Sequence, residues 1–168
     1  MYIAGGTRPD IMFAVSKLSC FLDCYREEHW KAAIRVLHYL KGTRDLHLVL
    51  GGKDRTPDLI SYTDSDYMND PGPMGKCSVG GYCFSLGSGL VSWSSKKQWT
   101  MADSTCTAEY IAASEAGHEL VWLRKLLISL GFPSPHTTPL LCDNTAAVLL
   151  CEDQAYHSRV KHIDVRYH

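Results

Sequence analysis

The sequence lacks an excess of charge of either sign. Its 168 residues include 17 Lys and Arg and 18 Asp and Glu, which gives a net charge of −1 when the histidines are neutral. A protein that grips nucleic acid over much of its surface is normally strongly basic, so we do not expect that class. An enzyme that contacts its substrate at a few local positions remains compatible with this balance.

The sequence also lacks a metal-binding cysteine pattern, a signal peptide and a long apolar run. Its seven cysteines are odd in number and include no Cys-x-x-Cys pair, so we expect neither a disulfide framework nor a structural zinc site. Cys20 and Cys24 are interpreted as core thiols. No stretch approaches the ~18 apolar residues that span a bilayer. These absences favour a reduced, intracellular environment with no membrane partner.

Two helices are predicted within residues 1–45. Thr7 can cap the first, with Pro9 in its first turn, and Gly42 ends the second. Apolar residues recur at helical spacing: Ile11, Val15, Leu18 and Leu22 in the first helix, and Trp30, Ile34, Leu37 and Leu40 in the second. This one-sided stripe must pack on something, either the chain's own domain or a larger upstream domain.

From Leu46 onward the apolar residues alternate, as is typical of strands. Strands are predicted at 46–50, 59–63, 79–86, 90–95 and 139–142, with a tight turn at Gly87-Ser88-Gly89. Helices are predicted from a Ser104 cap to Gly131 and over 144–151. This order predicts an α/β fold, with a mixed sheet that has helices on its faces.

Three acidic residues stand where chemistry is expected. Asp64 and Asp143 each follow an apolar strand, and Glu109 lies in the second turn of the long helix. A buried, unpaired carboxylate is costly, and three that converge repel one another unless divalent cations such as Mg²⁺ neutralise them. Each taken singly could instead be a turn or capping residue.

Several segments together resemble one family. SYTDSDY, VGGYCFSLGSGLVSWSSKKQ, STCTAEYIAASEAGHELVWLRKLL, LLCDNTAAV and HSRVKHIDVRYH resemble the ribonuclease H domain of copia-type LTR retrotransposon Pol polyproteins. TRPDIMFAVSKLSCF and HWKAAIRVLHYLKGT resemble the segment that joins reverse transcriptase to it. The resemblance implies a helical hairpin at 1–45 from the end of the reverse transcriptase connection. It implies a ribonuclease H-like domain at 46–168, with three antiparallel strands followed by a parallel one.

The resemblance also implies a function. Such domains hydrolyse the RNA strand of RNA–DNA hybrids with two Mg²⁺ ions, for which Mn²⁺ can substitute. Asp64, Glu109 and Asp143 match the first three acidic positions of that site, and Asp64 is expected to contact both ions. The expected partners are the hybrid and the upstream reverse transcriptase domain. The expected location is a cytoplasmic retrotransposon particle or the nucleus.

Small polar and basic residues near the carboxylates are candidates for substrate contacts. Backbone amides and hydroxyl groups can bind phosphates and ribose 2′-hydroxyls. The candidates are Ser65, Ser104, Thr105, Asn144, Thr145, Lys96 and Lys97. Ser104 and Asn144 are equally explained as helix caps, and the two lysines as solvated surface.

The sequence departs from the family pattern in four places. Thr107 replaces a second glutamate, Tyr67 replaces a tryptophan, and a basic pair is reduced to Lys76-Cys77. The family's last strand and helix, which carry a fourth metal-site aspartate, find no match before His168, so we expect a C-terminally truncated domain.

Three residues near the C-terminus do not fill the family's remaining roles. Asp164 is interpreted as a salt-bridged or capping residue rather than a substitute for the fourth aspartate. Neither His157 nor His162 matches the product-release histidine. Whether this chain is itself an active ribonuclease H is therefore left open. The alternatives are a non-catalytic retroelement remnant and a module that binds hybrids without cutting them.

Overall fold

The computed structural model describes residues 1–51, 58–70, 77–134 and 136–152. Its elements run in the order α1 (Tyr2–Gly6), η1 (Pro9–Ile11), α2 (Met12–Ser19), α3 (Glu27–Gly42), β1 (Leu59–Asp70), β2 (Cys77–Leu86), β3 (Gly89–Lys97), α4 (Thr105–Ser129), β4 (Leu140–Leu141) and α5 (Thr145–Glu152). Predictions for Lys76, His157, His162 and Asp164 lie outside the described residues.

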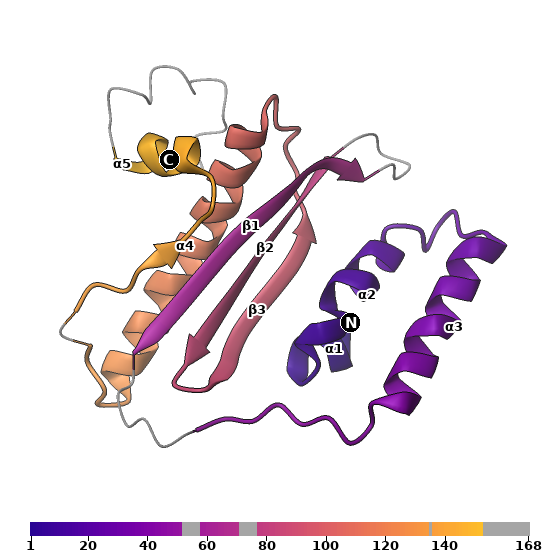
Figure 1. Cartoon of the computed structure of the whole chain (residues 1–168), viewed down its shortest axis with the longest axis horizontal. Helices are drawn as coiled ribbons and strands as arrows, with labels where there is room; N and C mark the ends of the chain where they lie inside the picture. The colour runs from indigo at the N-terminus through magenta and orange to yellow at the C-terminus, as the bar shows by residue number, and fades with distance from the viewer. Residues whose placement is uncertain (52–57, 71–76, 135, 153–168) are drawn as a thin grey trace.

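The sheet has the strand order β3-β2-β1-β4 (Figure 1). β1 pairs with β2 and β2 with β3 in antiparallel fashion, whereas β4 lies parallel to β1. Gly87 has a φ of 61° in the turn between β2 and β3, a conformation that glycine adopts without strain. The predicted mixed α/β sheet, with three antiparallel strands followed by a parallel one, is confirmed.

α4 and the N-terminal helices lie on opposite faces of this sheet. On β3, the Ser92 hydroxyl donates to Glu119 of α4, while the indole of the next residue, Trp93, donates to the Ala4 carbonyl of α1. Successive residues of a strand point to opposite faces, so the two contacts define the two layers. The main core lies under α4 and contains Leu59, Phe84, Ala116 and Leu123.

The N-terminal hairpin is confirmed, but its first helix is not continuous. Thr7 ends α1 instead of capping a long helix, and Pro9 starts a short 3-10 turn that leads into α2. Proline has no N–H to donate, which is why it is tolerated at the start of a helical segment. The α1–α2 side of the hairpin packs on β3 through Ala4, Ile11, Met12 and Trp93.

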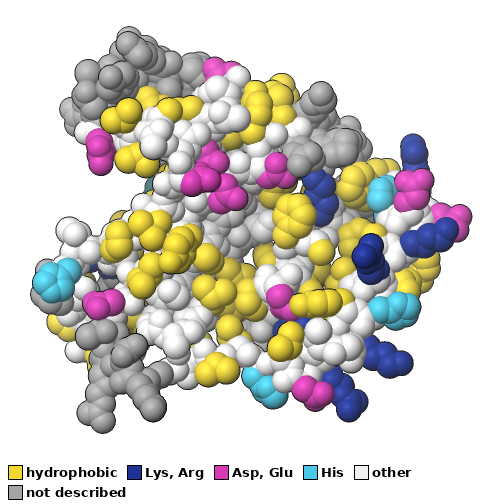
Figure 2. Space-filling view, in the orientation of Figure 1, with side chains coloured by type: hydrophobic (Ala, Val, Ile, Leu, Met, Phe, Trp, Pro, Cys, Tyr) yellow, Lys and Arg dark blue, Asp and Glu magenta, His cyan; other side chains and the backbone are white. Residues whose placement is uncertain are grey.

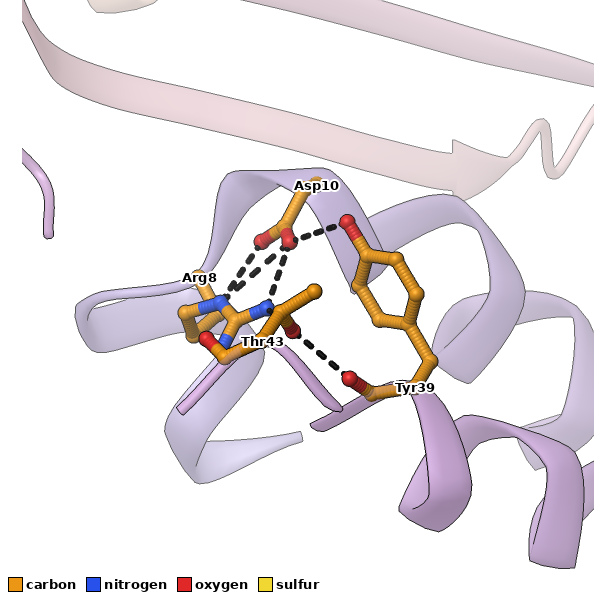
Figure 3. Close-up of polar contacts among 4 residues, drawn as sticks. All are labelled: Arg8, Asp10, Tyr39 and Thr43. Atoms are coloured by element: carbon orange, nitrogen blue, oxygen red, sulfur yellow. Dashed lines mark hydrogen bonds and ion pairs between the residues drawn. The ribbon is translucent and has the colours of Figure 1, made fainter. Parts of the chain in front are cut away.

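A polar cluster joins the two arms of the hairpin (Figure 3). Arg8 donates to Asp10 at 2.7 Å and to the Thr43 hydroxyl at 2.6 Å, and the Tyr39 hydroxyl donates to the same Asp10 oxygen at 2.9 Å. The hydrogen bonds from Arg8 hold the pKa of Asp10 below its usual value. These contacts fix the C-terminal end of α3 to the turn before α2.

Two strand predictions need correction. Residues 46–50 form no strand, because they pair with no neighbour and leave Leu46, Val49 and Leu50 largely exposed. β1 is longer than the predicted 59–63 and continues to Asp70, with a shift of register after Asp66. Pairing with β2 extends the strand through polar residues, so Asp64 lies within β1 and not at its end. Among the described residues, no helix is long and apolar enough to cross a membrane.

Candidate metal centre

The sheet register brings Asp64 and Asp143 to the same level. Tyr62 of β1 is paired with Leu141 of the parallel strand β4. Asp64 and Asp143 each follow this pair by two residues, on neighbouring chain segments. Glu109 reaches the same region from α4, which packs against β1.

One backbone amide connects the first two carboxylates. The Ser65 N–H donates to Asp64 Oδ1 at 2.8 Å and to Glu109 Oε1 at 3.2 Å. These two oxygens can therefore be at most 6.0 Å apart, the sum of the two distances. β1 and α4 thus hold the carboxylates close to one another across 44 residues of sequence.

A second group joins Glu109 to the segment after β4. Ligand atoms of Glu109, Cys142 and Asp143 all lie within 4.8 Å of one another, and Cys142 Sγ is 3.8 Å from Glu109 Oε2. Asp64 is not a member of this compact group. Glu109 is therefore the carboxylate that these contacts connect both to Asp64, through the Ser65 amide, and to Asp143. Acidic side chains gather between α5 and β1 on the face shown in Figure 2.

The environment of Glu109 disfavours a negative charge. Its side chain is buried, with 6% exposed, and its pKa is raised to about 7. Burial is the largest cause, followed by the charge of Asp64, with a smaller contribution from Asp143. The hydrogen bonds from the Ser65 amide and the Cys142 thiol act in the opposite direction. Such a set of carboxylates is suited to binding a cation, which would relieve the repulsion.

Sequence reasoning missed Cys142 as part of this centre. The residue is counted among the seven cysteines of the sequence and given no role, although its place directly before Asp143 is a usable signal. Burial raises the pKa of its thiol, which favours the protonated form as donor to Glu109. The interpretation of Cys20 and Cys24 as core thiols is wrong, because Cys24 is exposed and Cys20 is only partly buried.

Two of the known proteins similar to this chain are Pol polyproteins of plant transposons. The retrovirus-related Pol polyprotein from transposon TNT 1-94 of Nicotiana tabacum is 44% identical over 168 residues, which is 100% of this chain and 12% of that protein. The Pol polyprotein from transposon RE2 of Arabidopsis thaliana is 40% identical over 162 residues, 96% of this chain and 11% of that protein. The homologues of this chain thus include retrovirus-related Pol polyproteins from transposons, which match it over 96–100% of its length.

The chain spans about a ninth to an eighth of the length of these relatives. A shorter relative, the secreted RxLR effector protein 161 of Plasmopara viticola, is 43% identical over 123 residues, 73% of this chain and 84% of that protein. No family model and no solved structure matches the chain.

The remaining candidate residues differ in their surroundings. Ser104 and Asn144 are helix caps, since their side chains accept hydrogen bonds from the backbone N–H groups of Thr107 and Ala147. Thr105 and Thr145 are exposed at the first positions of α4 and α5. They are therefore placed to meet a ligand from solvent.

Cross-strand pairing places Lys96 in the row of Ser65. Ser65 pairs with Gly80, and Gly80 pairs with Lys96. Two strand spacings amount to about 10 Å. Lys96 is exposed there and Lys97 is half-buried beside it. A local positive charge thus lies near the carboxylates, although the chain as a whole is nearly neutral.

Proposed function

We propose that this Pol segment is a ribonuclease H-type nuclease that hydrolyses the RNA strand of RNA–DNA hybrids. The observation that carries the proposal is the approach of Asp64, Glu109 and Asp143 from β1, α4 and the end of β4. The sequence order of the three acidic residues and the mixed sheet agree with the resemblance described above. The similarity to Pol polyproteins supports a role within a retrotransposon polyprotein. The location that we propose is a particle in the cytoplasm or the nucleus.

The donor set fits Mg²⁺. Carboxylate oxygens are the ligands this ion prefers. Burial raises the pKa of Glu109 most, and the charges of Asp64 and Asp143 raise it further; a bound cation would offset these effects. Asp64, Glu109 and Asp143 would hold two ions, with Mn²⁺ as a substitute. When bound, the metal ions supply activation of water and stabilisation of the leaving oxygen in phosphodiester hydrolysis.

The chain's own residues would position the substrate. Thr105 and Thr145, exposed beside two of the carboxylates, offer hydroxyl groups to phosphate or ribose oxygens. Lys96 and Lys97 would attract the phosphate backbone of the hybrid. Lys96 is two strand spacings, or about 10 Å, from Ser65 across the sheet. Ser65 contributes its amide to the carboxylates, so its role is mainly to hold the site together.

The direct test is cleavage of a labelled RNA–DNA hybrid in Mg²⁺ or Mn²⁺. Asp143→Asn removes one negative ligand and should lower the rate on the order of a thousandfold or more. Asp58→Asn makes the same chemical change at an exposed carboxyl group just before β1 and should leave the rate unchanged. Equal cleavage by the parent chain and Asp143→Asn would eliminate the nuclease proposal.

The same experiment separates the nuclease from a binding module. A module that holds hybrids without cutting them needs the surface contacts but not the metal ligands. Hybrid binding that survives replacement of all three carboxylates, with no cleavage by the parent chain, would favour that alternative. Absence of both binding and cleavage would favour a remnant.

A further part of the proposal concerns residues 1–45. We propose that they form the end of the reverse transcriptase part of the polyprotein. The preceding sequence of that part would then cover an apolar groove between α2 and α3. The groove has a volume of about 900 Å³, and Met1 lies on its lining beside Leu18, Leu22, Trp30 and Leu37. Trp30 is 62% exposed and Leu37 is 59% exposed, which is unusual for two apolar residues of one helix face.

Hydroxyl-radical footprinting tests this covering segment. When the chain is joined to the polyprotein sequence that precedes it, oxidation of Trp30 and Leu22 should fall several-fold. Trp99, which is 85% exposed and does not line the groove, is the internal control and should keep its reactivity. Unchanged oxidation of Trp30 in the longer protein would show that the preceding sequence does not cover the groove.

A further inference from the structure

A buried glutamine lies behind the carboxylates. Gln98 directly follows β3 and is only 2% exposed. Its backbone N–H donates to the Ser78 carbonyl at 2.9 Å, which fixes the residue to β2. The sequence pattern gave this residue no role.

The side chain of Gln98 connects the neighbours of two acidic residues. Its Nε2 donates to the Ala108 carbonyl at 2.8 Å and to the Ser65 hydroxyl at 3.3 Å. Ala108 directly precedes Glu109, and Ser65 directly follows Asp64. One amide group therefore links α4 to β1 at the point where their carboxylates approach each other.

The orientation of this amide is determined by its partners. With the amide reversed, Oε1 would face the Ala108 carbonyl oxygen, and two acceptors cannot form a hydrogen bond. In the observed orientation, Oε1 is buried and has no hydrogen-bond partner within the described residues. An apolar side chain of similar size would avoid this unfavourable burial, so stability alone does not account for a glutamine here.

The packing around the amide leaves it little freedom. A Cβ atom built on Gly80 would lie 3.2 Å from Gln98 Nε2 and 3.4 Å from Ala112 Cβ. Gly80 therefore allows the amide to fit between β2 and α4. Any displacement of the amide would have to move the segment that contains Ser65 or the first turns of α4.

We propose that Gln98 is a positioning residue, which holds the Ser65 amide at the distance from Glu109 that the metal centre requires. The expected effect of Gln98 on cleavage rests on the proposed function. The geometry of its hydrogen bonds does not. Gln98 touches neither metal nor substrate, because its side chain is enclosed. Its effect is transmitted through Ser65, whose N–H is shared by Asp64 and Glu109.

The test uses the full chain and two readouts that a purely structural role would not change. Gln98→Met keeps the size of the side chain and removes both hydrogen bonds. The Ser65 amide proton should move upfield in ¹⁵N-resolved NMR without metal, and the dissociation constant for Mn²⁺ should rise about tenfold. Ser92→Ala is the control, since it removes a hydrogen bond between β3 and α4 away from the carboxylates. It should lower the melting temperature only.

A second variant keeps the inference testable if Gln98→Met folds poorly. Ser65→Ala removes the hydroxyl acceptor and leaves the residue-65 amide, whose proton should move in the same direction. The effects of the two substitutions on Mn²⁺ binding should be non-additive, because both remove the hydrogen bond between Gln98 and the Ser65 hydroxyl. An amide proton that is unmoved in both variants would overturn the inference, whatever the cleavage rate. A moved amide proton in a chain that cleaves no hybrid would refute the proposed function and support the positioning role.

Discussion

Replacement of Glu109 by Gln is expected to abolish cleavage and, in the absence of metal, to make the protein more stable. In the folded protein the pKa of Glu109 is raised to about 7, whereas the ordinary pKa of a glutamate side chain is 4.5. Between these values the folded state binds more protons than the unfolded state, so stability falls as pH rises through this window. A glutamine does not titrate, so the variant does not lose stability as the pH rises through this window.

The expected difference is large enough to measure by thermal unfolding in EDTA. At pH 8, Glu109→Gln should melt several degrees above the parent chain, from a stabilisation of at most about 3 kcal/mol. At pH 5, where Glu109 is mostly protonated, the two proteins should melt at nearly the same temperature. Addition of Mg²⁺ at pH 8 should raise the melting temperature of the parent much more than that of the variant.

Glu28→Gln is the matched control for this prediction. Glu28 is exposed in the first turn of α3, distant in sequence from the acidic centre. The same substitution of an amide for a carboxyl group there should produce no pH-dependent rise in melting temperature. Equal melting differences for Glu109→Gln at pH 5 and pH 8 would contradict the raised pKa of Glu109, which burial and the neighbouring carboxylates cause.

The sequence predicted the sheet and the long helix because both depend on local signals. Alternating apolar residues and the turn at Gly87 define β2 and β3, and the Ser104 cap defines the start of α4. The segment 46–50 shows the limit of this reasoning. Its leucines alternate as in a strand, but a strand also needs a neighbour to pair with, and alternation does not reveal one.

For the candidate site, the sequence supplied the carboxylates but not the groups between them. Asp64, Glu109 and Asp143 were selected by their positions relative to strands and a helix. Gln98 and Cys142 act through contacts with residues far away in the chain, such as Ser65 and Glu109. The length of β1 was underestimated for a similar reason, since pairing with β2 continues where the apolar pattern ends.

Replacement of Phe84 by Ala is expected to lower the stability of the fold strongly. Phe84 is 0% exposed and packs with Leu59, Ala116 and Leu123, so it joins the sheet to the middle of α4. Truncation of a buried Phe to Ala costs about 3–5 kcal/mol, through lost burial and the cavity that remains. Urea unfolding should therefore show a much lower midpoint. Phe13→Ala, at a side chain that is 51% exposed, should cost less than half as much.

The Phe84 variant also separates stability from the geometry of the centre. Glu109 lies two turns before Ala116 on α4, and its own contacts with Ser65 do not involve Phe84. Wherever the variant remains folded, its Mn²⁺ affinity should equal that of the parent, and cleavage should fall only with the folded fraction. A weakened Mn²⁺ site in the folded variant would mean that the core sets the carboxylate spacing. In that case the position of Glu109 would depend on the packing of α4 as a whole, rather than on the local contacts of Ser65 and Gln98.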